Sequence, residues 1–178
     1  MNRTGFCPEC GFDWEGPVGH LPEQLRSIPS EFEEAMAACD EIAVRARREA
    51  SVWSPLEYAG HARDVLAWYE ERIRRVLSEE RAQLTAVDWA RVTEERQYHR
   101  ETTRVILSGV AEAAVSFSDL LKSLSSEEWS RVGVGSEGDE RDVGILARRA
   151  VHEAVHHLMD VRRETLRVAV GERPQPPV

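Results

Sequence analysis

Apolar residues recur every three or four positions along four long stretches of the chain, which is the spacing of one face of an α-helix. The four predicted helices cover residues 29–50, 54–80, 97–124 and 142–168. Between them we expect a short element near residue 88, a capped turn at 125–129 and a glycine-rich loop at 132–139, without convincing strand alternation. This pattern predicts an all-α fold, a four-helix bundle in which side chains on facing helices build any site.

The second helix has the clearest start signal in the chain. Ser54 stands where an N-cap is expected, Pro55 follows at the first helical position, and Glu57 completes a capping box. Residues 1–28 contain several glycines and prolines, so we expect an irregular N-terminal arm with at most a short turn near residues 22–27. The bundle would then occupy residues 29–170, followed by a proline-containing flexible tail at 171–178.

Composition and charge narrow the class of protein. A chain of 178 residues suits one domain, and 23 basic against 32 acidic residues give a net charge of −9. This balance argues against nucleic acid as the main partner. No apolar run approaches the ~18 residues of a membrane span, and the N-terminus lacks an apolar signal core. We therefore expect a cytoplasmic protein without a membrane partner.

Two cysteines form a motif typical of metal sites. Cys7 and Cys10 are three positions apart, which lets two thiolates bind one ion in a tight turn. A closed tetrahedral zinc site needs two more ligands, and the alternatives are His20, Asp13, Cys39 or groups on another subunit. A redox pair and a pair of free thiols are the competing interpretations.

A cluster of histidines lies in the predicted fourth helix. At about 100° per residue, Glu153 and His157 fall at the edge of the apolar face and share a side of the helix. His152 and His156 fall on the far side, toward solvent or another subunit. Although His152-Glu153-x-x-His156 matches the zinc-protease pattern in letters, its two histidines therefore face away from the bundle.

His61 lies at the edge of the apolar face of the second helix. His61, Glu153 and His157 can therefore converge at one end of the bundle, as two imidazoles and a carboxylate with open coordination positions. Asp160 follows His157 by three positions and could hold its other ring nitrogen. A histidine beside an apolar face is also often a structural residue, so a bundle with inert histidines stays an alternative.

Two sequence runs resemble a known family. The run from Trp53 to Leu66, Trp-Ser-Pro-Leu-Glu-Tyr-Ala-Gly-His-Ala-Arg-Asp-Val-Leu, resembles the second-helix signature of the DinB/YfiT-like superfamily. The run from His152 to Val161 resembles the fourth-helix signature of its actinobacterial branch, and Cys7-x-Glu9-Cys10-Gly-Phe is similar to the start of that branch. The resemblance implies a four-helix bundle that holds a divalent metal at one end with three side chains.

The resemblance also implies the ligands. The first carries over to His61, and Glu153-x-x-x-His157 followed by Asp160 is similar to the N-terminal domain of the mycothiol-dependent maleylpyruvate isomerases. Other members use His-x-x-x-His, which would instead assign His152 and His156. Zinc is the metal we expect first, with nickel, iron or manganese as alternatives.

Relatives of this kind imply a metal-dependent enzyme, and we expect a low-molecular-weight-thiol S-transferase that joins a thiol such as mycothiol to a small electrophile. The alternatives are a metal-dependent hydrolase and a non-catalytic metal- or stress-responsive binding module. The apolar helix faces are also compatible with a homodimer. The candidates for substrate contacts near the mouth of the bundle are Tyr58, Trp68, Arg63 and Arg149.

Overall fold

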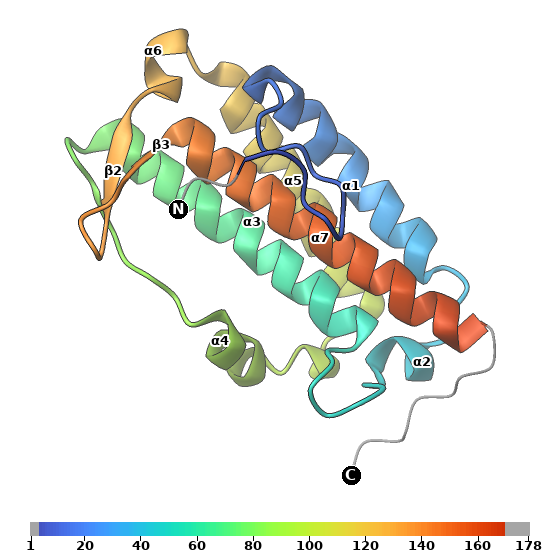
Figure 1. The fold of residues 1–178 in the computed structure, drawn as a ribbon. Helices are drawn as coiled ribbons and strands as arrows, with labels where there is room; N and C mark the ends of the chain where they lie inside the picture. The colour runs from blue at the N-terminus through green and yellow to red at the C-terminus, as the bar shows by residue number, and fades with distance from the viewer. Residues whose placement is uncertain (1–3, 170–178) are drawn as a thin grey trace.

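Four long helices run along one another in the computed structural model, which describes residues 4–169 (Figure 1). They are α1 (Leu21–Met36), α3 (Pro55–Ser78), α5 (Thr103–Ser123) and α7 (Val143–Ala169). Helices α1 and α3 each pack against both α5 and α7, so they lie diagonally opposite each other. The predicted four-helix bundle is confirmed.

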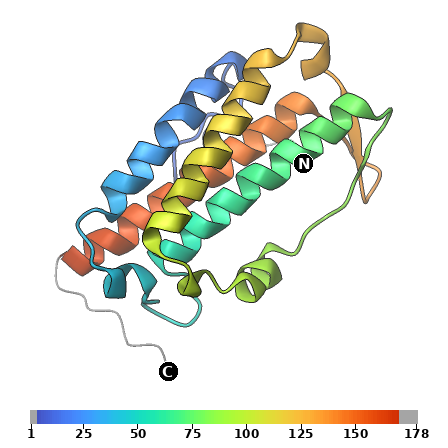
Figure 2. The same ribbon diagram turned by 180° about the vertical axis from the view of Figure 1, so that it is seen from behind.

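The direction of the helices requires a long crossing connection. Helices α1 and α7 point one way, and α3 and α5 point the other way (Figures 1 and 2). Because α3 and α5 are parallel neighbours, the link between them must return along the whole bundle. This link carries β1 (Gln83–Leu84), α4 (Trp89–Arg96) and the 3-10 turn η2 (Tyr98–Arg100). It brings α4 beside the N-terminal half of α3.

The predicted start of the second helix is confirmed in detail. The Ser54 hydroxyl accepts a hydrogen bond from Glu57 N, and the Glu57 carboxylate accepts one from Ser54 N. The third helix begins later than predicted, at Thr103, where the Thr102 hydroxyl caps it. Gln97 adopts a positive φ of 51° between α4 and η2. Glu101 and Thr102 are extended, so the residues before Thr103 do not continue into α5.

The first helix begins earlier than predicted. It starts at Leu21 and ends at Met36, with Pro29 inside it, and a separate short helix, α2 (Glu41–Arg45), follows. An interior proline costs about 3 kcal/mol. A continuous buried stripe offsets this cost, since each large apolar side chain that it buries contributes about 1.5–3 kcal/mol. The stripe consists of Leu21, Leu25, Ile28, Phe32 and Met36. The predicted tail at 171–178 lies outside the described residues.

The crossing link is held against α3 by close packing. Tyr98 is fully buried, and a Cβ atom at Gly60 would lie 2.6 Å from its ring, so only glycine admits this contact. The Tyr98 hydroxyl donates a hydrogen bond to Asp64 at 3.0 Å. These contacts hold the crossing link against α3 at Gly60, one residue before His61. They therefore also hold α4, which belongs to the same link, close to His61.

A small sheet joins the link to the segment before α7. β2 (Val132–Gly135) pairs in parallel with β1 and antiparallel with β3 (Glu140–Asp142). The prediction of a loop over residues 132–139 was therefore wrong for the first four residues. Gly133 packs so closely on Leu84 that a Cβ would lie 2.7 Å from its side chain. Local sequence cannot show such a distant contact. The capped turn is present as α6 (Ser126–Trp129).

The N-terminal arm folds across the outer side of α7, where Figure 1 shows it in dark blue. A tight turn brings Gly11 N to Cys7 O at 2.9 Å, and Gly11 has a φ of +74°. The buried side chains of Cys7 and Phe12 anchor the arm, which ends in the 3-10 turn η1 (Val18–His20). None of the described helices has both the length and the apolar composition of a membrane span.

Candidate metal centres

Helix α7 carries two pairs of ligand-type side chains, each pair four residues apart. Glu153 and His157 face α3, as the helical phase predicts, and they meet His61 there. His152 and His156 face the N-terminal arm, where they meet the two cysteines. We call the first group the inner cluster (His61, Glu153, His157) and the second the outer cluster (Cys7, Cys10, His152, His156).

The inner cluster brings three ligand atoms together. One nitrogen from each of His61 and His157 and one Glu153 oxygen all lie within 4.8 Å of one another. The two imidazole rings have centroids 4.7 Å apart, and His157 Nε2 lies 3.6 Å from Glu153 Oε2. His61 sits two turns into α3 and is almost fully buried.

In both His61 and His157, the Nδ1 atom of the ring has a polar partner outside the inner cluster. His157 Nδ1 lies 3.0 Å from Asp160 Oδ2, so the predicted contact is present. Since a carboxylate only accepts, Nδ1 carries the hydrogen and Nε2 keeps its lone pair for the centre of the cluster. His61 Nδ1 similarly faces the Thr93 hydroxyl of α4 at 3.5 Å.

The electrostatics of the inner cluster fit a divalent cation. Burial, reinforced by the neighbouring His157, lowers the pKa of His61 to about 4, so this imidazole is neutral at pH 7. Burial alone would raise the pKa of Glu153, but the surrounding histidines outweigh it and the pKa is lowered. Neutral imidazoles and an ionised carboxylate are the forms that bind zinc and similar cations. Three such ligands leave coordination positions open for a further molecule.

Aromatic rings form a wall around the inner cluster. Trp53 lies 5.0 Å from the His61 ring, and Trp89 of α4 lies 5.1 Å from it on an edge-to-face approach. Tyr58 stacks on His157 with centroids 5.3 Å apart. The crossing link therefore closes one side of the cluster with Trp89 and Thr93.

The other candidates for substrate contacts lie further out. Trp68 touches Trp89 and stacks with Arg72, whose guanidinium carbon is 4.0 Å from the indole centroid. Arg63 binds the carboxylates of Asp64 and Glu101 and lies against α5. Arg149 interacts electrostatically with Tyr69. Of the four candidates, only Tyr58 directly contacts an inner-cluster ring through the interactions described above.

The outer cluster joins the CxxC turn to α7. Ligand atoms of Cys7, Cys10, His152 and His156 lie within 4.8 Å of one another, and Cys7 Sγ is 3.8 Å from His156 Nδ1. The residues that the sequence offered as partners are elsewhere. Asp13 Oδ1 accepts a hydrogen bond from Glu15 N, Cys39 Sγ faces the Thr165 carbonyl, and His20 is exposed at the end of η1.

Sequence comparison places this bundle in a family. The chain matches the DinB superfamily over residues 24–161. It belongs to the DinB superfamily. The matched range contains the whole inner cluster and begins after both cysteines of the outer one.

A solved structure shares the fold of this DinB-superfamily protein. YfiT from Bacillus subtilis, described as "a probable metal-dependent hydrolase with an unusual four-helix bundle topology", superimposes with a TM-score of 0.78. The match covers 85% of this chain and 87% of YfiT at 14% sequence identity. At that identity the likeness concerns the fold. No curated protein sequence matches the chain.

The environment of His152 is the largest departure from the sequence-based expectation for this DinB-superfamily protein. Its position on the far side of α7 was inferred correctly, but that side is not solvent. His152 is only 4% exposed, because the rings of Trp14 and Phe12 cover it at 4.4 and 5.6 Å. Helical phase shows on which side of α7 a residue lies relative to the apolar face. It cannot show that a segment distant in the sequence packs over the opposite side.

The two thiols of the outer cluster have different acidities. Burial raises the pKa of Cys7, but the backbone N–H of Cys10 and the nearby His152 favour the thiolate more strongly and lower the pKa to about 6. Burial and the Cys7 sulfur raise the pKa of Cys10 to about 11. The surroundings of the CxxC turn therefore favour a thiolate at Cys7 beside a thiol at Cys10.

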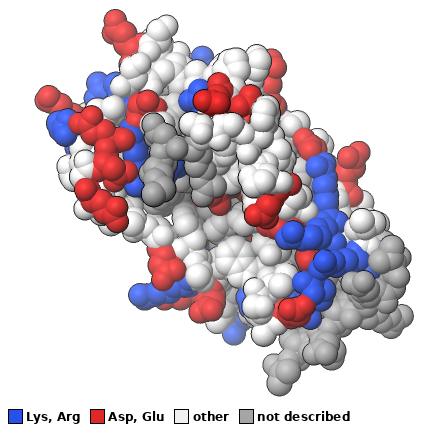
Figure 3. Space-filling model, in the orientation of Figure 1, with Lys and Arg blue, Asp and Glu red and all other residues white. Residues whose placement is uncertain are grey.

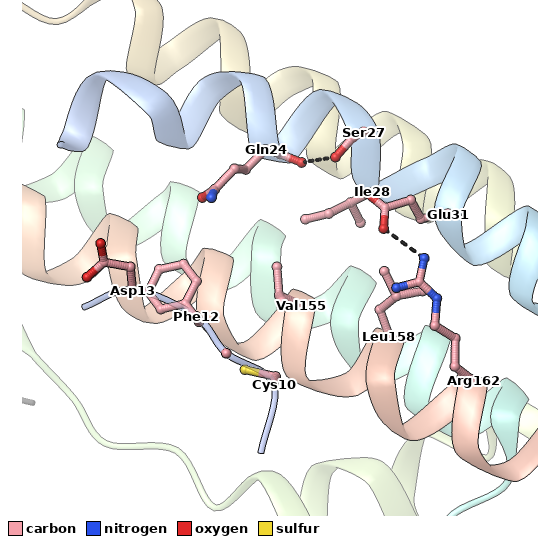
Figure 4. Close-up of a pocket in the computed structure, with 11 residues that line it drawn as sticks. Cys10, Phe12, Asp13, Gln24, Ser27, Ile28, Glu31, Val155, Leu158 and Arg162 are labelled. Atoms are coloured by element: carbon pink, nitrogen blue, oxygen red, sulfur yellow. Dashed lines mark hydrogen bonds and ion pairs between the residues drawn. The ribbon is translucent and has the colours of Figure 1, made fainter. Parts of the chain in front are cut away.

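An open groove of about 300 Å³ lies between the arm, α1 and α7 (Figure 4). Its floor is apolar, with Ile28, Val155 and Leu158, and Glu31 binds Arg162 at 2.8 Å along its rim. Cys10 is the one residue of the two clusters that lines it.

Arginines gather over the C-terminal half of α7 in Figure 3. One residue of this part of the helix, Arg163, binds the carboxylate of Asp160.

Proposed function

We propose that this DinB-superfamily protein is a metal-dependent enzyme that holds a divalent cation with His61, Glu153 and His157. The observation that carries the proposal is the convergence of three ligand atoms within 4.8 Å, with Asp160 on the far nitrogen of His157. A carboxylate on the second nitrogen of a metal-binding histidine fixes its ring and raises its basicity. Zinc is the cation that we propose first, and nickel, iron and manganese are the alternatives to test.

The reaction that we propose is transfer of a low-molecular-weight thiol, such as mycothiol, to a small electrophile. A divalent cation in the inner cluster would lower the pKa of a bound thiol or water, so that an anionic nucleophile is available near neutral pH. In the transfer, the sulfur forms a bond to an electrophilic carbon, the leaving group departs with its electron pair, and the thiol proton passes to solvent.

The surrounding side chains of this chain would position the electrophile. Trp53, Tyr58 and Trp89 offer an apolar wall that excludes water beside the ligands. Burial and the nearby Asp160 raise the pKa of Tyr58, so its hydroxyl stays protonated at neutral pH. That hydroxyl can donate a hydrogen bond to a substrate oxygen or a leaving group.

Hydrolysis is the second candidate function. It is favoured by the shared fold with YfiT, which is itself described as a probable metal-dependent hydrolase. The same open coordination positions would then accept water in place of a thiol.

The first experiment measures bound metal per chain after loading with zinc, nickel, iron(II) or manganese. We expect His157→Ala and Glu153→Gln to lose one equivalent of metal that the control His20→Ala retains. The second experiment follows formation of a sulfur–carbon bond between mycothiol, or cysteine as a simpler thiol, and the fluorogenic electrophile monochlorobimane.

The outcomes separate the candidate functions. Thiol conjugation that needs metal and is lost in His157→Ala supports the transferase. Ester or amide cleavage that needs metal and proceeds without thiol supports the hydrolase instead. If His157→Ala and Glu153→Gln retain the metal content of wild type, the inner cluster is not a metal site and both proposals fail. A non-catalytic binding module or a bundle with inert histidines then remains.

A further inference from the structure

His152 is a buried side chain whose two ring nitrogens are not satisfied by a hydrogen bond from the described residues. It is 4% exposed, and neither ring nitrogen makes a hydrogen bond among the described residues. Leaving a buried donor or acceptor unsatisfied costs its full desolvation free energy, so such a group in a native core usually has a further partner. Its neighbours in the outer cluster are two sulfurs and a second imidazole.

We infer that Cys7, Cys10, His152 and His156 form a second metal site, a closed structural zinc centre that fixes the N-terminal arm on α7. Two cysteines and two histidines are a donor set of structural zinc sites, and the CxxC spacing is typical of them. All four ligand atoms come from this one chain and lie within 4.8 Å of one another. This site is distinct from the inner cluster and does not depend on the proposed function.

A carboxylate stands beside one ring nitrogen of each histidine. His156 presents Nδ1 toward Cys7 Sγ at 3.8 Å, while its Nε2 lies 3.6 Å from Glu9 Oε2. His152 Nδ1 lies 3.6 Å from Glu153 Oε1. Carboxylates in these positions are the partners that orient metal-binding histidines.

A zinc ion here would stabilise a segment that has little core of its own. Only Cys7 and Phe12 of the described arm before η1 are buried. Four protein ligands close the coordination sphere, so the centre would be structural, without an open position for a substrate. It would join a turn near the N-terminus to a helix near the C-terminus, and so restrain the helix that also supplies Glu153 and His157.

The two centres meet at Glu153. Its carboxylate contributes one oxygen to the inner cluster while the other lies beside His152. Loss of the outer zinc should therefore also change the affinity of the inner cluster, whereas loss of the inner metal leaves all four outer ligands in place.

Cobalt(II) substitution tests the outer centre without any enzymatic assay. We expect wild type to show a thiolate-to-cobalt absorption band in the near ultraviolet, together with strong visible bands of tetrahedral cobalt. Both should be lost in Cys7→Ser and His156→Gln. They should persist in Cys39→Ser, which removes a thiol outside the cluster, and in His61→Ala, which removes an inner-cluster ligand.

A measurement on the unaltered protein covers the case in which these variants do not fold. Alkylation of each cysteine with iodoacetamide is followed by peptide mass spectrometry, with zinc bound and after chelation. We expect zinc to protect Cys7 and Cys10 and to leave the reactivity of Cys39 unchanged. Equal alkylation in both states, or a Cys7–Cys10 disulfide that forms despite excess zinc, would overturn the outer site.

The results also distinguish failure of this inference from failure of the proposed function. Loss of cobalt–thiolate absorption in Cys7→Ser with metal retained in His157→Ala would support the outer site and overturn the inner one. The opposite pattern would support the inner site and overturn the outer one.

Discussion

His156 and His157 are consecutive in the chain, and their rings stand at 90° with centroids 5.7 Å apart. Each belongs to a different cluster. One residue of an α-helix turns the side chain by about 100°, so two neighbouring histidines can serve two sites on adjacent sides of one helix. A displacement of this part of α7 would therefore affect both clusters.

The contact between Asp160 and His157 predicts the effect of Asp160→Asn. The amide cannot supply the negative charge that holds the Nδ1 hydrogen of His157, so we expect metal affinity at the inner cluster to fall about 10–100-fold. Competition with a chromophoric chelator measures this affinity. Thr93→Val, which removes a neutral partner of His61 at 3.5 Å, should have a smaller effect. The control is Asp119→Asn, whose exposed carboxylate pairs with Arg26. An unchanged affinity in Asp160→Asn would contradict the prediction.

The close approach of Tyr98 to α3 predicts that Gly60→Ala destabilises the fold. The added Cβ would lie 2.6 Å from a fully buried ring that cannot move aside, and such overpacking costs about 1–3 kcal/mol. Urea unfolding measures the loss. Gly19→Ala is the matched control, because no atom lies within 4 Å of its added Cβ. If both substitutions cost equally little, Tyr98 is not packed as described.

Two serine capping boxes in the described part of the chain predict unequal effects of the same substitution. Ser54 is fully buried at the start of α3, and its hydroxyl caps the helix that carries His61. Ser54→Ala should cost about 1–2 kcal/mol. Ser125→Ala removes the same cap from the four-residue helix α6, whose described residues include none that are buried, and should cost less. Thermal or urea unfolding of both variants measures the two losses of stability. A larger loss in Ser125→Ala than in Ser54→Ala would contradict the prediction.

The ion pair between Arg47 and Glu57 predicts a stability that depends on pH. Burial alone would raise the pKa of Glu57, but hydrogen bonds from Arg47 and Ser54 outweigh it, so the pKa is lowered on folding. A lowered carboxyl pKa stabilises the fold above the unfolded value near 4.3 and loses this effect as pH falls through the folded value. Arg47→Met should therefore cost about 1–3 kcal/mol at pH 7 and less in acid.

Urea unfolding of wild type and Arg47→Met at a series of pH values measures this difference, in which contributions common to both proteins cancel. Arg91→Met is the control. Its pair with Glu95 is exposed on α4, and solvent screens such pairs so that they contribute little to stability. A difference between wild type and Arg47→Met that grows as pH falls would contradict the assignment.

Much of the bundle could be predicted because its signals are local. The Ser54-x-x-Glu57 box determined where α3 begins, and helical phase directed Glu153 and His157 toward α3 while turning His152 away. The start of α1 was missed because a proline inside a helix is normally a strong breaker, and only burial on both sides of Pro29 offsets its cost.

The partners of the cysteines could not be predicted for a physical reason of another kind. The CxxC turn identifies half of a metal site, and the sequence offered His20, Asp13 and Cys39 as its completion. The residues that lie beside it, His152 and His156, are more than 140 positions away along the chain. No periodicity relates segments that far apart, because their contact depends on how the arm packs over the finished bundle.

The sequence alone therefore determined that four long helices form, where α3 begins, the phase of α7 and the three side chains of the inner cluster, since each follows from local geometry and side-chain type. Only the tertiary structure decided that the arm lies on α7, that Trp89 and Thr93 of the crossing link close the inner cluster, and that His152 is buried. These contacts join distant segments, and they form only when the apolar faces of four helices have been brought together.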